Sequence, residues 1–167
     1  MIVNPNIFNS SCRRQTVASL PILVCVSDIK EDLKLEDFCS IKTTGTKILV
    51  GTGLYLSHLM ATYTDVIYVN QKEGLSLAHY YANADVVVCP NGFQGHPRIV
   101  AEAACCGTPV ATRSHHITDD LIIKHVTGEI SPDLLQSINQ CLSFERSTIE
   151  QIGHLLFTKQ NNLISHL

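Results

Sequence analysis

The chain has 167 residues, of which 45% are hydrophobic and only 16% charged, and its formal net charge is −3. Chains of this length usually form one core, and so few charged residues argue against disorder. No run of Lys and Arg provides the basic face that nucleic-acid binding normally needs. No apolar stretch is long enough to cross a membrane, and Asn and Arg residues interrupt the region of a secretory signal. We therefore predict a cytoplasmic single domain that does not bind nucleic acid.

The first 20 residues contain Pro5 and several Asn, and they predict an irregular lead-in or linker. From residue 21 onwards, short apolar runs alternate with amphipathic segments. The apolar runs predict strands at 22–26, 47–51, 66–69, 86–89 and 109–112. The segments between and after them predict helices at 32–41, 55–62, 73–83, 98–106 and 118–125. Most of the runs are continuous rather than alternating, which is typical of parallel strands covered on both faces.

Residues 128–130 predict a sixth short strand, and helices are expected at 132–142 and 145–159. Ser131 is expected to cap the first of these helices, with Pro132 at its first position. The repeated strand and helix predict an α/β fold, in which a Rossmann-like, doubly wound parallel sheet precedes the C-terminal helices.

This domain is expected to span residues 21–160 and to be followed by a tail at 161–167. Ligands of such sheets bind beyond the carboxyl ends of the strands. The candidate loops at those ends are 27–34, 51–53, 90–97 and 113–118.

The seven cysteines are odd in number and form no C-x-x-C pair, which indicates free thiols in a reducing compartment. Four of them lie in apolar segments, where a free Cys acts as a small hydrophobic residue. The eight histidines show no spacing typical of metal ligands. We therefore predict neither a metal site nor a cofactor.

Two segments at the predicted ligand edge are candidates for chemistry. Gly51 and Gly53 follow a strand and would let a ligand approach the backbone, although ordinary turns use glycines in the same way. The loop before Arg98 enters a helix whose free N–H groups are a natural seat for a phosphate. Glu102 lies one turn into that helix, in a small and apolar run. A carboxylate there needs a partner, which is either a capping or lysine contact or a ligand hydroxyl.

These segments resemble the C-terminal, nucleotide-sugar-binding domain of group 1 glycosyltransferases of the GT-B fold. The similar stretches are Leu49-Val-Gly-Thr-Gly-Leu54, Leu77-Ala-His-Tyr-Tyr-Ala-Asn-Ala84, Ala84-Asp-Val-Val-Val-Cys-Pro90, Glu102-Ala-Ala-Cys-Cys-Gly-Thr-Pro-Val110 and Val126-Thr-Gly128. They follow the order and spacing of the family motifs over roughly residues 20 to 160.

The resemblance implies retaining transfer of a hexosyl group from a UDP- or GDP-linked sugar. It places Glu102 at the acid that holds the ribose hydroxyls. It places Gln94, where the family has an acid, at the contact with the donor sugar. Donor binding is further expected at the glycines Gly51 and Gly53 and at the backbone N–H groups of Arg98 and Ile99.

The loop after the first strand departs from the family pattern. The family commonly has an Arg and a Lys there for the donor pyrophosphate, and this chain has Asp28 and Leu33. Such cations are usually a major electrostatic part of catalysis. The residues available to replace them are Lys30, Lys34 and Arg98.

The family's acceptor site comes largely from an N-terminal domain, and the length of this chain leaves no room for one. We therefore expect a donor-binding domain with a degenerate site, active only with a separate chain that supplies the acceptor half. Contact with a membrane surface would come through that half. The alternatives are a non-catalytic interaction or regulatory module that retains the fold, and the remnant of a split reading frame.

Overall fold

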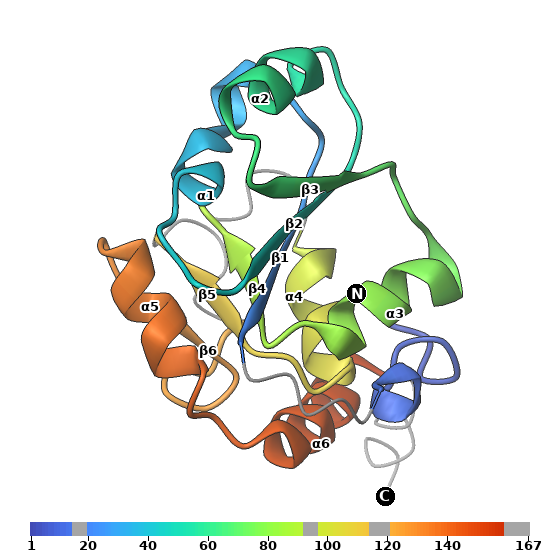
Figure 1. Ribbon diagram of the computed structural model, residues 1–167. Helices are drawn as coiled ribbons and strands as arrows, with labels where there is room; N and C mark the ends of the chain where they lie inside the picture. The colour runs from blue at the N-terminus through green and yellow to red at the C-terminus, as the bar shows by residue number, and fades with distance from the viewer. Residues whose placement is uncertain (15–19, 92–96, 114–120, 159–167) are drawn as a thin grey trace, which may run out of the picture.

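The computed structural model describes residues 1–14, 20–91, 97–113 and 121–158. Within these ranges the chain forms one six-stranded sheet and six α-helices (Figure 1). The strands are β1 (Ile22–Val26), β2 (Thr46–Val50), β3 (Val66–Val69), β4 (Val86–Cys89), β5 (Val110–Thr112) and β6 (Gly128–Ile130). The helices are α1 (Glu36–Cys39), α2 (Leu56–Thr62), α3 (Gly74–Asn83), α4 (Arg98–Cys105), α5 (Leu134–Cys141) and α6 (Arg146–Phe157).

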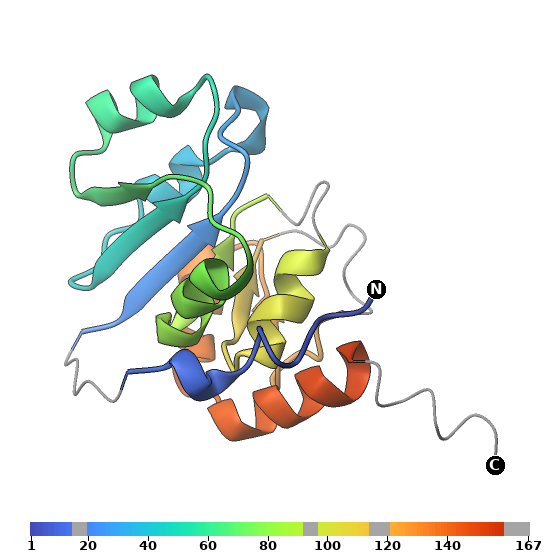
Figure 2. The same ribbon diagram turned by 90° about the vertical axis from the view of Figure 1, so that its right-hand side faces the viewer.

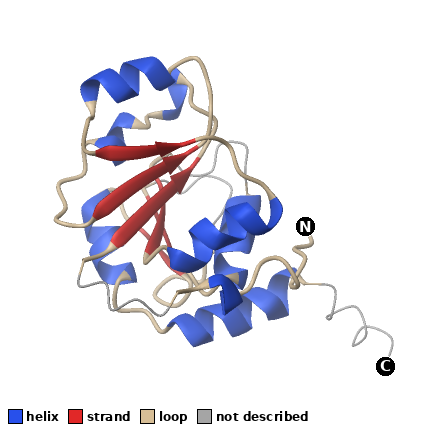
Figure 3. Cartoon of the chain, turned by 45° about the vertical axis from the view of Figure 1, so that its right-hand side comes forward, coloured by secondary structure: helices blue, strands red, loops and turns tan. Residues whose placement is uncertain are grey.

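All neighbouring strands are parallel and lie in the order β3-β2-β1-β4-β5-β6, side by side as Figure 3 shows. This order confirms the predicted doubly wound, Rossmann-like sheet. The first three strands build the sheet in one direction from β1, and the next three build it in the other. The order therefore reverses between β1 and β4, where sheets of this type form their ligand crevice.

The two faces of the sheet carry separate hydrophobic clusters because side chains alternate along each strand. Leu23 and Cys25 of β1 pack with residues of α1, α2 and α5. Val24, which lies between them, packs with residues of α3, α4 and α6. Figures 1 and 2 show these two sets of helices on opposite faces of the sheet. Because both faces are covered, the strands are continuous apolar runs, as the sequence predicted.

The helix predicted over residues 32–41 is divided in two. Residues Glu31–Leu33 form a 3-10 helix, and Lys34 then adopts a left-handed conformation with a φ of 50° before α1 begins. A left-handed residue interrupts a right-handed helix, which explains the break. Leu35 and Phe38 are nevertheless buried, in agreement with the predicted apolar face.

The start of α5 also differs from its prediction. Asp133, rather than Ser131, is the N-cap, and its Oδ1 accepts hydrogen bonds from the N–H groups of Leu135 at 3.0 Å and Gln136 at 3.2 Å. A carboxylate is a strong acceptor at the positive end of a helix, so the helix begins after Pro132 rather than at it.

The helix predicted at 118–125 falls partly on residues 118–120, which lie outside the described residues. The described remainder, 121–125, is not helical. His125 has a φ of 66°, and the N–H groups of Val126 and Thr127 both donate to the carbonyl of Ile123. This turn leads directly into β6, so too few residues remain there for a helix.

Residues 1–14 pack against the domain, although only Ser10–Cys12 form a regular element. Val3 and Phe8 are buried in the cluster beneath α3, α4 and α6. The N–H of Val3 donates to the carbonyl of Phe157 at 2.7 Å, at the end of α6. The start of the chain therefore runs beside α6, as Figure 2 shows.

Helix α4 lies unusually close to α6 because no side chain separates them at Gly153. A Cβ atom at this position would lie 2.5 Å from the carbonyl carbon of Ala104. Arg146, at the start of α6, also fixes the end of α3 by donating to the carbonyls of Ala82 at 2.9 Å and Ala84 at 2.7 Å. These contacts hold α6 against α4 and against the end of α3.

Gly153→Leu should therefore destabilise the fold strongly. The added side chain collides with the backbone of α4, and such overpacking usually costs about 1 to 3 kcal/mol. We expect a loss of this size in the free energy of unfolding, measured by urea denaturation. Gln151→Leu introduces the same side chain at an exposed position of α6 and should change stability by less than about 0.5 kcal/mol. Equal effects of the two substitutions would contradict this account of the packing.

Candidate functional site

A pocket of about 360 Å³ lies at the carboxyl edge of the sheet, at the point where the strand order reverses. Its walls come from the loops after β1, β2 and β3, from α3 and from the first two turns of α4. The pocket therefore occupies the position where a doubly wound sheet binds its ligand.

The glycines after β2 allow two of these loops to meet. A Cβ on Gly51 would lie 1.9 Å from the carbonyl oxygen of Ser27, and one on Gly53 would lie 2.1 Å from that of Ile29. The N–H of Ile29 also donates to the carbonyl of Thr52 at 3.0 Å. Gly51 lines the pocket, and Gly53 does not. Both glycines are thus required by the close approach of the loops, and one of them also faces the pocket.

The first turn of α4 faces the pocket. Pro97 precedes the helix and provides no side-chain hydrogen bond to its N-terminal N–H groups. Arg98 and Ile99, the first two residues of the helix, line the pocket, and their contact with a donor stays a prediction. The start of α4 can therefore offer backbone donors and the positive end of its dipole to an anion.

Glu102 lies at the inner end of the pocket and is 5% exposed. Its partner is Arg98, whose Nε donates to Oε1 at 2.6 Å along the same helix. Burial raises the pKa of Glu102, and the Arg98 guanidinium opposes this rise. We expected a carboxylate at position 102 to need a partner, and that partner is Arg98, one helical turn earlier.

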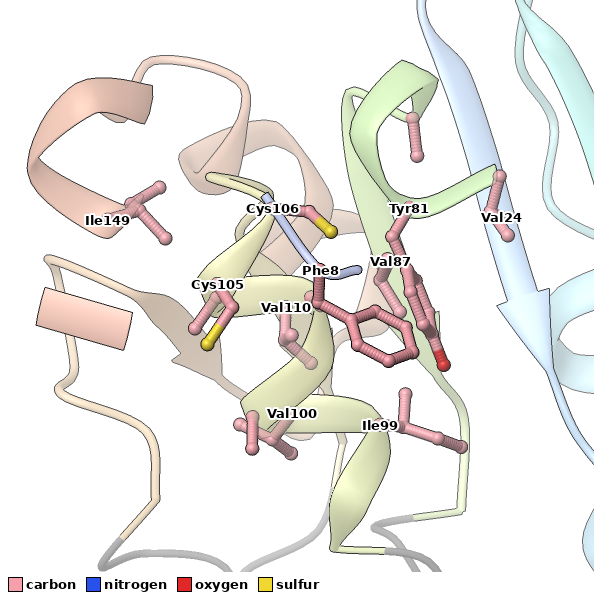
Figure 4. Packing of buried hydrophobic residues seen from close by; sticks show 14 of the residues in the cluster. Phe8, Val24, Tyr81, Val87, Ile99, Val100, Cys105, Cys106, Val110 and Ile149 are labelled. Carbon is pink, nitrogen blue, oxygen red and sulfur yellow. The ribbon is translucent and has the colours of Figure 1, made fainter. Parts of the chain in front are cut away.

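Tyr81 completes the inner wall of the pocket. Its side chain is fully buried, and Figure 4 shows its ring beside that of Phe8, with the hydroxyl pointing towards Ile99. The hydroxyl approaches Glu102 without reaching the geometry of a direct hydrogen bond, and no other described residue is its hydrogen-bond partner. Burial and the nearby carboxylate raise the pKa of Tyr81 well above its usual value. A buried donor is therefore available beside a buried carboxylate.

The charges around the pocket differ from those that the sequence suggested. Lys30 forms an ion pair with Asp28 at 3.7 Å, and neither Lys30 nor Lys34 lines the pocket. Asp28 itself does line it. The cations that line it are Arg98 and Lys72.

Lys72 belongs to the loop after β3, which sequence reasoning did not include among the candidates. The signal that would have found it is its place, three residues after the end of a predicted strand. Glu73, on the same loop, also lines the pocket, so the described residues of its lining include three acidic and two basic side chains.

Gln94 lies outside the described residues, and its contact with a donor sugar stays a prediction. Within the described ranges, no three His, Cys, Asp or Glu side chains are placed to hold a metal ion. In the same part of the chain, no helix is both long and apolar enough to span a bilayer.

The family described as Glycosyl transferases group 1 matches this chain over residues 21–143. Curated protein sequences give no significant match.

Solved structures of the same fold match nearly the whole chain. HepE from Anabaena, in complex with UDP and glucose, is 19% identical with a TM-score of 0.71, and the match covers 99% of this chain and 55% of HepE. Sucrose-phosphate synthase from Thermosynechococcus elongatus is 22% identical with a TM-score of 0.74, and the match covers 98% and 49% of the two chains. The lipopolysaccharide outer core galactosyltransferase WaaB is 14% identical with a TM-score of 0.73, with coverage of 99% and 54%. The chain thus spans about half the length of these proteins.

Glu102→Gln should remove a pH-dependent cost of folding. Because the pKa of Glu102 is raised above 4.5 in the folded state, folding is favoured while the group is protonated. Stability is therefore lost as the pH rises from the unfolded pKa through the folded one. We expect the advantage of the variant in unfolding free energy over the natural protein to grow as the pH rises through and above the ordinary titration range of a glutamate, measured by urea denaturation. Glu31→Gln, at an exposed position, is the control, and an equal pH dependence of both variants would contradict the prediction.

Proposed function

The chain belongs to the group 1 glycosyltransferase family, and we propose that its pocket binds the nucleotide part of a nucleotide-sugar donor. The observation that carries this proposal is the buried Glu102 carboxylate at the reversal point of the sheet, one turn from the uncapped start of α4. A carboxylate that accepts two hydrogen bonds suits the vicinal hydroxyls of a ribose. The free N–H groups of α4 suit the attached phosphates.

The state of Glu102 supports a ligand role. Oε1 accepts a hydrogen bond from Arg98 at 2.6 Å, and the buried hydroxyl of Tyr81 beside this carboxylate has no hydrogen-bond partner among the described residues. A buried carboxylate usually has its acceptors satisfied, because an unused one costs free energy. A ribose hydroxyl would supply a further donor to this carboxylate, and the Tyr81 hydroxyl lies close enough to join the same network.

Uridine diphosphate is the first candidate for the nucleotide. HepE, which shares the fold, is described in complex with UDP and glucose and also with UDP-glucose. In this proposal the N–H groups of Arg98 and Ile99 bind the diphosphate, and they stabilise its charge as the glycosidic bond to the sugar breaks. In this proposal the nucleotide sugar is the substrate, and no separate cofactor is needed. The transfer of the sugar retains its anomeric configuration.

The charges of the pocket make transfer slow in this proposal. Asp28 lines the pocket where the family commonly has an arginine, and it brings a negative charge towards a dianionic leaving group. The electrostatic stabilisation of that group is a large part of catalysis in transfer reactions. The negative charge of Asp28 in the pocket also favours the second candidate function. This is a non-catalytic regulatory module that binds a nucleotide and signals the binding to a partner.

The acceptor half belongs to residues outside this sequence, whether on a separate N-terminal chain or on the same polypeptide. This half would bring any contact with a membrane surface. Cytoplasmic location fits the cysteines, all seven of which are free thiols. Such thiols are typical of a reducing compartment.

Titration calorimetry tests nucleotide binding directly. We expect UDP, or GDP if the base differs, to bind with a Kd below about 1 mM. Glu102→Gln should weaken binding by about 10- to 100-fold, because a hydrogen bond to a charged group is usually worth 1.5 to 3 kcal/mol. Glu31→Gln makes the same chemical change outside the pocket and should leave the Kd unchanged. Absence of binding by both nucleotides, or binding indifferent to Glu102, would refute the proposal.

Asp28→Asn and Asp28→Arg test the electrostatic explanation of the weak site. Removing a negative charge from the pocket should tighten UDP binding by roughly 3- to 30-fold at low salt, and adding a positive charge should tighten it further. The gain should shrink at high ionic strength. Asp32→Asn and Asp32→Arg are the matched controls on an exposed residue outside the pocket. A gain of the same size in the controls would show a general effect of net charge instead.

A further inference from the structure

Arg98 uses only one edge of its guanidinium in its contact with Glu102. Nε donates to Oε1 at 2.6 Å, and the terminal nitrogens make no hydrogen bond to any residue of the described chain. The side chain of Arg98 is 64% exposed, whereas that of Glu102 is 6% exposed. The guanidinium therefore covers a buried charge on one side and presents its remaining N–H donors to the open pocket.

The position of the guanidinium places it between two kinds of binding group. Arg98 is the first residue of α4, and its side chain runs one helical turn, about 5.4 Å, along the axis to Glu102. The N–H groups of the helix start, to which Pro97 gives no side-chain cap, lie at one end of this span, and the carboxylate lies at the other. A ligand that used both ends would pass over Arg98.

Electrostatics make the same side chain necessary for such a ligand. A carboxylate and a diphosphate in one pocket repel each other, and the low dielectric of a buried site strengthens the repulsion. Arg98 neutralises Glu102 through Nε and still has a fork of donors suited to phosphate oxygens. Lys72, the other cation that lines the pocket, forms no ion pair with Glu102.

We propose that Arg98 couples the two parts of the nucleotide site. Through Nε it holds Glu102 in place for a ribose diol, and through its terminal nitrogens it binds a phosphate of the same ligand. This inference rests on the proposed function and adds to it a positioning residue whose side chain also contacts the ligand. If Arg98 couples the two parts, the ribose diol and the phosphates of the ligand do not contribute independently to its binding free energy.

The experiment compares UDP, uridine and inorganic pyrophosphate by titration calorimetry. Arg98→Gln keeps a hydrogen-bonding side chain and removes the charge. We expect it to weaken UDP binding by about 30- to 100-fold, and uridine binding by no more than about 5-fold. Arg98→Lys retains a charge without the fork, so it should recover only part of the UDP affinity.

A double-mutant cycle measures the coupling itself. Arg98→Gln combined with Glu102→Gln should weaken UDP binding by clearly less than the product of the two single effects. Arg113→Gln is the matched control, because Arg113 is an exposed arginine that donates to Asp37 at 2.6 Å outside the pocket. It should leave all three affinities unchanged. Urea unfolding of each variant separates loss of binding from loss of folding.

The outcomes distinguish this inference from the proposed function. If Arg98→Gln weakens uridine and UDP by the same factor, Arg98 only supports Glu102, and the inference is overturned while nucleotide binding stands. If the effects at positions 98 and 102 multiply, the coupling is absent and the inference also falls. If the natural protein binds neither UDP nor GDP, the proposed function fails first, which the titration shows before any variant is made.

Discussion

The position of α4 is the constraint on which both the core and the pocket depend. Every residue from Ile99 to Cys105 is buried, so the helix cannot move without disturbing the cluster around it. On one side it lies directly against the backbone of α6, because Gly153 has no side chain. Gly107, in a left-handed conformation, then turns the chain towards β5. The packing that stabilises the fold thereby also fixes Arg98 and Glu102 relative to the strands.

Two of the buried charges in the described part of the chain, Lys47 and Glu102, have different surroundings, and only Glu102 lines the pocket. Lys47 is 3% exposed, and its Nζ donates to the carbonyls of Cys39 and Ile41 and pairs with Asp65 at 2.8 Å. Its hydrogen-bonding capacity is used, as a structural ion requires. Among the described residues, Glu102 accepts a hydrogen bond from Arg98 alone and faces a pocket, beside the Tyr81 hydroxyl, which has no hydrogen-bond partner there. Incomplete satisfaction of buried polar groups is expected where a ligand completes the network.

Much of the fold was predictable because parallel strands covered on both faces must be continuously apolar, and the five main strands have this pattern. Helix ends were less predictable. A serine before a proline and an aspartate after it are both acceptable caps, and only the packing of α5 selects Asp133. The left-handed turn at Lys34 likewise leaves no signal in the apolar spacing. Glu102, Arg98, Ile99 and Gly51, which the sequence offered as candidates from the predicted loops, the predicted helix and the family motifs, all line the pocket, whereas the loop containing Lys72 was missed.

The sequence by itself determined the fold class, the edge of the sheet at which the pocket lies and the family, because these depend on local patterns of apolar residues and on the spacing of motifs. Only the tertiary structure decided which charges share the pocket. Lys30 and Arg98 are equally plausible cations in the sequence, but the loop after β1 places Asp28 in the pocket and leaves Lys30 outside it. Whether a side chain reaches a site depends on contacts between segments distant in the chain. No local pattern encodes these contacts.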